Sequence, residues 1–559
     1  MRTLLTTLHS KYIHASLALP CLAAYCGDAC GEILIHEYTV NEPKEAVLAQ
    51  IVACDADVIC FSVYLWNRVA TLDLVDCLKR INPQLKIVLG GPEISFEEET
   101  FFSSCPVDGL ICGEGEIVLQ SLLSAWQKGE SHVPVAGLRL PGHPENNGLS
   151  LLDSLDDIPS PFAAGLVDLT RGLVYYESSR GCPYTCSFCM SALDDRVRSF
   201  STERIESDLK ILMDNRVAKI KFVDRTFNYH HQRSRDIFNF ILQNNHSSHF
   251  HFEIGAHLLD QATLKLLEKV PKGVFQFEIG VQSTLPETLQ RVGRKASLER
   301  LAENIGYLKQ KTNIHLHLDL IAGLPGDDYP QFLKSIDWTY ALGADHLQIE
   351  PVKLLPGAPL RLQAAEWGIK FNPNPPYTIL CSNDLKFIDL ERLSGIASLL
   401  DLLVNSGRFS YLINKLFRDF SCLSLFLEDL DAYWRDNNLY YHRRSLRDLY
   451  LEVNNYLQRR FAGAKLREYQ ELLGRDYAHH ERVVGGSAPV FFNTELDEQE
   501  SKSVRERIKQ ELTGLQRSGK VQYFSAVFEQ LAEYPGRTIL IYLYLSKSSA
   551  GLQVKELVL

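Results

Sequence analysis

The stretch "ESSRGCPYTCSFCM" (177–190) carries three cysteines, Cys182, Cys186 and Cys189, in the spacing C-x3-C-x2-C. A closed structural zinc site takes four ligands and disulfides use cysteines in pairs, so three thiols match neither arrangement. No further Cys or His follows at the customary spacing of zinc ligands. A redox C-x-x-C pair would leave the first cysteine without a role. An iron–sulfur cluster held by three thiolates uses all three cysteines and leaves one iron open to an added ligand.

The residues around this stretch, 171–360, alternate apolar runs with helical stretches. Six βα units of this kind predict a partial or complete βα barrel, with its chemistry at the carboxyl ends of the strands. We expect strands at "LVYYESSRG" (173–181), "KIKFVDRTF" (219–227), "FHFEIGAH" (250–257), "VFQFEIGVQS" (274–283), "IHLHLDLIAGLPG" (314–326) and "HLQIEPVKLLPG" (346–357).

An earlier series of alternating strands and helices occupies residues 1–125. The strand-like runs, such as "ADVICFSVYL" (56–65) and "KIVLGGPE" (86–93), are continuously apolar. Such strands are typical of a parallel sheet that is covered on both faces, so this region predicts a doubly wound α/β domain.

The whole chain has 559 residues, which at about 150 residues per domain predicts roughly three or four domains. The segments that follow the two α/β regions are a Pro-, Gly- and Ser-rich linker and a mainly helical C-terminal domain with a last strand-like run, "RTILIYLYLS". We predict a first α/β domain at 1–135, a linker at 136–170, a βα barrel at 171–365 and the mainly helical domain at 366–559.

Composition limits the compartment and the partners. Net charge is −11, which argues against a whole-chain affinity for nucleic acid, and no apolar run approaches the ~18 residues of a membrane helix. The N-terminal 20 residues lack a proper signal peptide, and the 13 cysteines predict free thiols or metal ligands rather than disulfides. We therefore expect a cytoplasmic protein without a membrane partner.

The cysteine spacing, placed after the first strand of a barrel and with the aromatic Phe188 before the last cysteine, resembles the signature of the radical S-adenosylmethionine (SAM) superfamily. The resemblance covers about 171–360. It implies a 4Fe-4S cluster whose open iron binds the methionine part of SAM. Reductive cleavage of SAM would then give a 5′-deoxyadenosyl radical, with an external reductase such as flavodoxin or ferredoxin as the electron source.

The same resemblance implies a set of SAM contacts at the strand ends. Acidic groups suit the ribose hydroxyls or the amino group, an arginine suits the SAM carboxylate, and a glycine segment lets the backbone approach adenine. For each residue, the alternative is a strand-end side chain with a purely structural role. The implied SAM residues are Phe188, Asp224, Glu253, Gln282, Arg294, Asp319, Gly323 and Pro325.

The first domain resembles the cobalamin-binding domain of cobalamin-dependent radical SAM enzymes through "SVYLWN" (62–67), "LGGPE" (89–93) and "VDGLICGEGE" (107–116). Glycines at strand ends let a bulky ligand approach the backbone beyond the carboxyl edge. The alternative is an α/β domain that binds nothing. The implied cobalamin residues are Ser62, Trp66, Gly90, Gly91, Gly113 and Glu114.

The D-x-H-x-x-G motif that supplies a cobalt-ligating histidine is missing from the first loop, "LHSKYIHAS". His9 and His14 are therefore alternative lower ligands, and Trp66 alternatively covers the lower face of the corrin. Cys21, Cys26 and Cys30 could suggest a second cluster, as in methylthiotransferases. They are interleaved with Leu and Ala along a predicted helix, which favours buried core thiols.

The C-terminal stretch 440–468 carries seven Arg or Lys residues between Arg443 and Arg467, with interleaved tyrosines. Such a pattern could bind RNA, or it could form an amphipathic helix with a solvated basic face. The leading hypothesis is a cobalamin-dependent radical SAM methyltransferase acting on a small molecule, a peptide or RNA. The alternatives are radical cyclisation or rearrangement, RNA methylthiolation, and a non-enzymatic iron–sulfur carrier.

Overall fold

The computed structural model describes residues 1–559 except 132, 143–147, 194–195, 421, 443, 485, 515–520 and 549–550. Parts of the predicted linker and of the basic C-terminal stretch therefore lie outside the described residues. Arg443 is one of the residues outside them. The chain forms two compact units, Met1–Leu390 and Glu391–Leu559. The first unit contains both predicted α/β regions and extends past the predicted boundary at residue 365.

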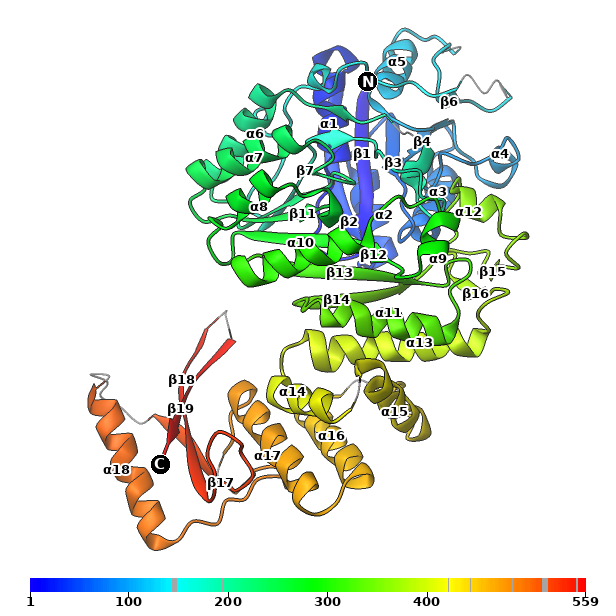
Figure 1. The fold of residues 1–559 in the computed structure, drawn as a ribbon. Coiled ribbons are helices and arrows are strands. Elements are labelled where there is room, and N and C mark those ends of the chain that lie inside the picture. The colour runs from blue at the N-terminus through cyan, green and yellow to red at the C-terminus, as the bar shows by residue number, and fades with distance from the viewer. Residues whose placement is uncertain are drawn as a thin grey trace. The chain divides into compact units, whose positions relative to one another are not determined.

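The first sheet has the strand order β2-β1-β3-β4-β5-β6, in which all neighbours are parallel except β5 and β6 (Figure 1). Its strands are β1 (Arg2–His9), β2 (Glu32–Thr39), β3 (Val58–Ser62), β4 (Lys86–Gly90), β5 (Gly109–Ile111) and β6 (Leu138–Arg139). The helices between them are α1 (Ala18–Cys26), α2 (Lys44–Ala53), α3 (Arg68–Ile81), α4 (Phe101–Ser104) and α5 (Glu116–Gln127).

Both faces of the first sheet are buried, because successive side chains of a strand point to opposite faces. Leu4 belongs to the core that α2 and α3 cover, whereas Leu5 belongs to the core that α1 and α5 cover. This arrangement confirms the predicted doubly wound domain.

The second sheet has the order β14-β13-β12-β11-β10-β7, and every pair is parallel. Each of the six predicted strands is present: β7 (Leu173–Tyr176), β10 (Lys219–Phe222), β11 (His249–Glu253), β12 (Phe275–Gln282), β13 (His315–Ala322) and β14 (His346–Pro351). Within the described residues, the edge strands β7 and β14 do not pair with each other, so the barrel is partial.

The helices of the second sheet cover one of its faces (Figure 1). Phe238 on α7, for example, packs against Phe252 and Phe275, with ring centroids 5.2 Å away in both cases. These helices are α6 (Thr202–Asp214), α7 (His231–Asn244), α8 (Gln261–Leu267), α9 (Pro286–Arg291), α10 (Leu298–Lys311) and α11 (Tyr329–Ala341). The opposite face is left for polar residues.

Shorter elements complete the first unit. The two-stranded pair β8 (Ser179–Arg180) and β9 (Arg198–Ser199) encloses the cysteine stretch. There are also four 3-10 turns, η1 (Asp28–Cys30), η2 (Leu155–Asp157), η3 (Met190–Leu193) and η4 (Ala256–Leu258). The others are the helix α12 (Pro359–Leu362) and the hairpin of β15 (Lys370–Phe371) and β16 (Ile379–Cys381).

The second unit begins within α13 (Phe387–Leu399), which continues into the π-helical turn η5 (Leu400–Asn405). Its helices are α14 (Ser410–Asp419), α15 (Leu423–Asp436), α16 (Leu446–Arg460), α17 (Gly463–His480) and α18 (Glu498–Gly514). A three-stranded antiparallel sheet of β17 (Gln522–Phe528), β18 (Thr538–Ser548) and β19 (Gly551–Val558) ends the chain. The predicted last strand is β18; the strands on either side of it were not predicted.

None of the 13 cysteines is in a disulfide bond. Among the described residues, no helix has the length and apolar character that crossing a bilayer requires.

Candidate active site

The cysteine loop runs from Gly181 to residue 197 and is closed at its base by β8 and β9. Cys182 and Cys186 are buried, and Cys189 is partly exposed. Gly181 has a φ of 91°, and a Cβ at this position would lie 2.0 Å from the carbonyl oxygen of Arg196. Only glycine allows the two ends of the loop to approach this closely.

Three hydrogen bonds fix the loop to segments that follow other strands. The hydroxyl of Tyr184 lies 2.8 Å from Nε2 of His257, and the backbone N–H of Ser187 donates to the carbonyl of Val292 at 2.9 Å. The N–H of Leu360 donates to the carbonyl of Ser187 at 2.8 Å. The thiols are therefore held at the carboxyl ends of the second sheet, where a βα barrel places its chemistry.

Asp224 supports the chain just before the loop. It is fully buried and accepts hydrogen bonds from the N–H of Ser178 at 3.0 Å, the hydroxyl of Ser178 at 2.6 Å and the hydroxyl of Ser179 at 2.5 Å. Arg233 lies 3.6 Å from the same carboxylate. These contacts give Asp224 a structural task, and its assignment to SAM stays a prediction.

Arg294 and Gln282 lie beside the cysteine loop. Nη1 of Arg294 is 4.0 Å from Sγ of Cys186, and its Nη2 donates to the carbonyl of Gly280. Burial raises the pKa of the Cys186 thiol, while the Arg294 guanidinium acts to lower it. A Cβ on Gly280 would lie 2.0 Å from Nε2 of Gln282, so glycine makes room for this pair.

This neighbourhood fits the implied cluster and a polar ligand beside it. Oε1 of Gln282 and Nε of Arg294 are buried and have no hydrogen-bond partner in the described part of the chain. Buried polar atoms are normally satisfied, so these two favour an added polar ligand. Among the described residues, no three His, Cys, Asp or Glu side chains converge as the ligands of a single metal ion do. A cluster binds its three thiolates through separate irons.

Polar side chains occupy the face of the second sheet that the helices leave uncovered. Lys221 lies 3.4 Å from the carboxylate of Glu278 and 3.8 Å from that of Glu253. Burial and the neighbouring Glu278 raise the pKa of Glu253 to about 7. Burial opposes ionisation of Glu278 too, but His251 and Lys221 outweigh it and lower its pKa to about 2. The carboxylate of Glu278 is thus anionic near neutral pH, whereas that of Glu253 is readily protonated.

Two histidines extend this polar face. Nε2 of His251 is 2.8 Å from Glu278, while its buried Nδ1 has no partner within the described residues. His317 lies on the next strand but one, 3.2 Å from the carboxylate of Asp319, and burial raises the pKa of Asp319. Sequence reasoning missed Lys221, His251 and Glu278, although the alternation of polar and apolar residues in "HFHFE" and "FQFEIG" carries the signal.

The first loop of the N-terminal domain reaches the same face. Strand register pairs Tyr175 with Lys221, and the Tyr175 hydroxyl lies 2.7 Å from Nδ1 of His14. His9 is buried beside Glu37 at 3.5 Å. Both histidines that were candidates for a cobalt ligand therefore have side-chain partners inside the protein.

The predicted cobalamin residues lie along the carboxyl edge of the first sheet. The carbonyl of Ser62 accepts hydrogen bonds from the hydroxyl of Thr7 at 2.8 Å and from the side-chain amide of Asn67 at 3.2 Å. Gly91, directly after Gly90 at the end of β4, has a φ of 101°, and a Cβ there would lie 2.6 Å from the carbonyl oxygen of Val63. This glycine lets the ends of β3 and β4 pack against each other.

Trp66 stands out at this edge, because its side chain is 49% exposed. Its indole N–H donates to the carbonyl of Leu8 at 3.0 Å, and its ring stacks on Tyr64 with centroids 4.6 Å apart. A fixed, exposed aromatic surface suits the flat face of a large ring.

Gly113 and Glu114 differ from the other predicted cobalamin residues in their contacts. Gly113 has a φ of 82° and packs against the side chain of Leu149. Glu114 forms ion pairs with Arg198 and Arg180, which lie at the base of the cysteine loop. Its assignment to cobalamin stays a prediction.

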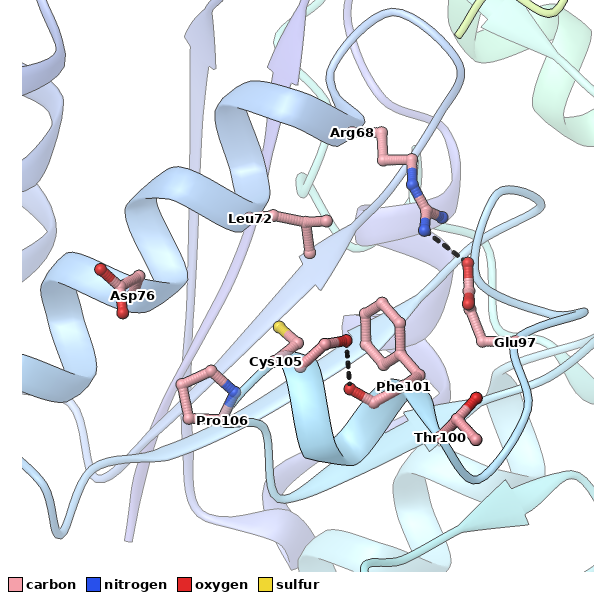
Figure 2. A pocket seen from close by; sticks show the side chains of 9 residues that line it. Arg68, Leu72, Asp76, Glu97, Thr100, Phe101, Cys105 and Pro106 are labelled. Atoms are coloured by element: carbon pink, nitrogen blue, oxygen red, sulfur yellow. Dashed lines mark hydrogen bonds and ion pairs between the residues drawn. The ribbon is translucent and has the colours of Figure 1, made fainter. Parts of the chain in front are cut away.

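Figure 2 shows a surface pocket of about 370 Å³ on the first domain, between α3 and α4. Arg68 pairs there with Glu97 at 2.5 Å, and its guanidinium lies 5.8 Å from the centroid of the Phe101 ring. None of the residues lining it was predicted to bind a cofactor, and none belongs to the cysteine loop.

Comparison with family models divides the chain into three parts. A "B12 binding domain" model matches residues 4–123, and a "Radical SAM superfamily" model matches residues 176–339. A model described as "Protein of unknown function (DUF4080)" matches residues 365–529.

Individual relatives are similar to about half of the chain. An uncharacterized methyltransferase of Pyrococcus horikoshii is 27% identical over 50% of this chain and 63% of its own length. The cobalamin-dependent radical SAM methyltransferase TokK of Streptomyces tokunonensis is 26% identical over 58% of this chain and 51% of its own length. The chain thus spans between half and two thirds of these relatives.

Among solved structures, the cobalamin-dependent S-adenosylmethionine radical enzyme OxsB superposes with a TM-score of 0.57 at 15% identity. The match covers 93% of this chain and 82% of OxsB. At this identity the likeness shows a shared fold.

Proposed function

We propose that this chain, in which a B12 binding domain precedes a radical SAM domain, is a cobalamin-dependent radical SAM enzyme that methylates an unactivated centre. The observation that carries the proposal is the cysteine loop, in which the Cys186 thiol lies beside Arg294, next to the unsatisfied buried atoms of Arg294 and Gln282. The names of TokK and of the Pyrococcus relative support methyl transfer over the other radical reactions.

In this proposal, Cys182, Cys186 and Cys189 hold the 4Fe-4S cluster, which supplies the electron that cleaves SAM, while cobalamin carries the methyl group. Arg294 offers a cation to the SAM carboxylate, a pairing that a forked guanidinium favours. Gln282 and Asp319 would accept hydrogen bonds from the ribose hydroxyls of SAM. Trp66 with Tyr64 presents the aromatic surface for the corrin.

We further propose that the substrate is polar and binds against the uncovered face of the second sheet. Its central side chains, Lys221, His251 and Glu278, offer one cation, one anion and a hydrogen-bonding imidazole. A lipid would leave the buried Nδ1 of His251 without a partner, at a cost of roughly 1–3 kcal/mol, and would remove the water around the Lys221–Glu278 ion pair. Tyr175 and His14 bring the first domain to this face, so the substrate would lie between the two cofactor-binding parts.

A one-electron donor such as flavodoxin or ferredoxin would reduce the cluster, and the enzyme would work in the cytoplasm. The same proposal includes cobalamin contacts for Ser62, Gly90, Gly91 and Gly113 and SAM contacts for Phe188, Glu253, Gly323 and Pro325.

The test is anaerobic incubation of the reconstituted protein with SAM, cobalamin, a reductant and a cell extract. We expect 5′-deoxyadenosine and S-adenosylhomocysteine to form together, since each methylation would consume one SAM for the radical and one for the methyl group. Formation of neither nucleoside by a protein that holds its iron would contradict an enzyme and favour an electron carrier. 5′-Deoxyadenosine alone would contradict methyl transfer.

A further inference from the structure

Two arginines face each other at the base of the cysteine loop. Arg180 ends β8, Arg198 begins β9, and the antiparallel register pairs them directly across the hairpin. Like charges directly opposite each other destabilise a strand pair. The base of the loop therefore needs carboxylates to hold it closed.

Two of those carboxylates come from the first domain. Arg198 binds both carboxylate oxygens of Glu114, one of them at 3.1 Å, and donates to the carbonyl of Leu152 at 2.8 Å. Nη2 of Arg180 donates to Glu116 at 2.7 Å, and its Nη1 lies 3.6 Å from Glu114.

The third carboxylate is local. Nε of Arg180 donates to Glu177, three residues earlier in the chain, at 2.9 Å. The side chains of Arg180, Arg198, Glu114 and Glu116 are only 5 to 17% exposed. Removing one member of such a buried group leaves its partner uncompensated, which costs far more than breaking a surface ion pair.

We propose that Glu114 and Glu116 are positioning residues for the iron–sulfur cluster: through Arg180 and Arg198 they hold the cysteine loop in the shape that retains the cluster. This inference rests on the proposed function and deepens it. It makes Glu114, together with Glu116, a support of the cluster rather than a contact to cobalamin.

The test compares iron retention with cobalamin affinity in the reconstituted full-length enzyme. For Glu114→Gln and Glu116→Gln, we expect transfer of iron to a ferrous chelator to become about tenfold faster, since part of a buried ion-pair energy of several kcal/mol is lost. The Kd for cobalamin, followed by its absorption spectrum, should stay within about twofold of the wild-type value, as befits residues without a contact to it.

Arg171→Gln is the matched control. Arg171 pairs with Glu37 at 2.6 Å and also joins the two α/β regions, yet neither residue lies at the base of the loop. We expect iron release from this variant at the wild-type rate. Equal acceleration in Arg171→Gln would assign the effect to general loosening of the domain contact and overturn the proposal.

Two more variants separate positioning from folding. The double variant Glu114→Gln/Arg198→Gln should release iron no faster than Arg198→Gln alone. If Glu114 acts through Arg198, the effects of the two substitutions on the release rate do not add. Arg198→Lys keeps the charge but loses the forked geometry, so it should fold, release iron at an intermediate rate and alter the EPR spectrum of the reduced cluster.

If both glutamine variants released iron at the wild-type rate, the proposal would be overturned. It would also be overturned if cobalamin binding weakened while iron release stayed unchanged, because Glu114 would then act as a cobalamin contact. A wild-type chain that takes up no iron at all would contradict the proposed function itself.

Discussion

The two parallel sheets of the first unit have the same strand–helix alternation but treat their faces differently. The first sheet is apolar on both faces, so that Leu4 and Leu5, neighbours on β1, enter two separate cores. The second sheet is apolar on one face only. On the other face, residues such as Lys221, His251 and Glu278 contact one another across neighbouring strands.

These two ways of covering a sheet determine where each sheet can bind a ligand. A sheet covered by helices on both faces leaves only its carboxyl edge accessible, which is where the predicted cobalamin residues lie. A partial barrel has an inner face as well as an edge. The second sheet can therefore hold a cluster and SAM at its strand ends and a polar substrate against its inner face.

Removal of one cluster thiol should have the largest effect. Cys186→Ala takes away a buried thiol that lies 4.0 Å from Arg294, and we expect loss of nearly all iron and of all SAM cleavage. Iron analysis and the visible absorption spectrum of the reconstituted variant measure this. Full iron retention would show that the edge of the second sheet is not a cluster site.

A change on the inner face should separate substrate binding from SAM cleavage. Glu278→Gln removes the anion that Lys221 and His251 share, so we expect methyl transfer to fall by about a hundredfold through misplacement of the substrate. The measurement is the ratio of labelled product to 5′-deoxyadenosine, with methyl-labelled SAM and a cell extract.

Glu350→Gln is the control for this variant, because Glu350 pairs with Lys353 at 3.0 Å on the edge strand β14, where its side chain is 48% exposed.

The same labelling experiment tests whether the substrate is polar. We expect the methyl label in the product to partition into the aqueous phase of the extract. Label that collects in the lipid phase would contradict a polar substrate.

Sequence patterns predicted both sheets because strand–helix alternation and runs of apolar residues are local signals. The cysteine loop was equally visible, since its three cysteines lie within eight consecutive residues. The contacts of Glu114 with Arg198 could not be predicted in this way, because they join residues 84 positions apart and depend on how two domains pack. The hydrogen bonds of Asp224 with Ser178 and Ser179 likewise join residues 46 and 45 positions apart, so no local signal predicts them.

At the edge of the first sheet, Gly91→Ala should destabilise the fold by about 1–3 kcal/mol, because the new Cβ meets the Val63 carbonyl oxygen at 2.6 Å. Gly129→Ala is matched in backbone conformation, with a φ of 79°, but nothing lies within 4 Å of its Cβ. Urea unfolding of both variants separates contact from strain. Equal losses would mean that the β3–β4 contact adds nothing.

A smaller effect should appear in the pH dependence of the free energy of unfolding. Burial raises the folded-state pKa of Glu253 from 4.5 to about 7, so the folded state binds this proton more tightly than the unfolded state. The resulting stabilisation is complete below about pH 4.5 and is lost as the pH rises through about 7. In Glu253→Gln, this decline should disappear between about pH 5 and pH 7. An unchanged slope in urea unfolding of the apo-protein would contradict the assignment.

The smallest effect is expected for the cysteines of the first domain. Cys26 and Cys30 are buried in the core that α1 and α5 cover, and burial raises the pKa of the Cys26 thiol well above its usual value. A protonated thiol in an apolar core is a poor metal ligand, because metals bind the thiolate. Cys26→Ala should therefore keep the wild-type iron content and lose about 1 kcal/mol of stability. Loss of several irons from this variant would indicate a second cluster and would favour the methylthiotransferase alternative. Both sheets would then carry iron chemistry.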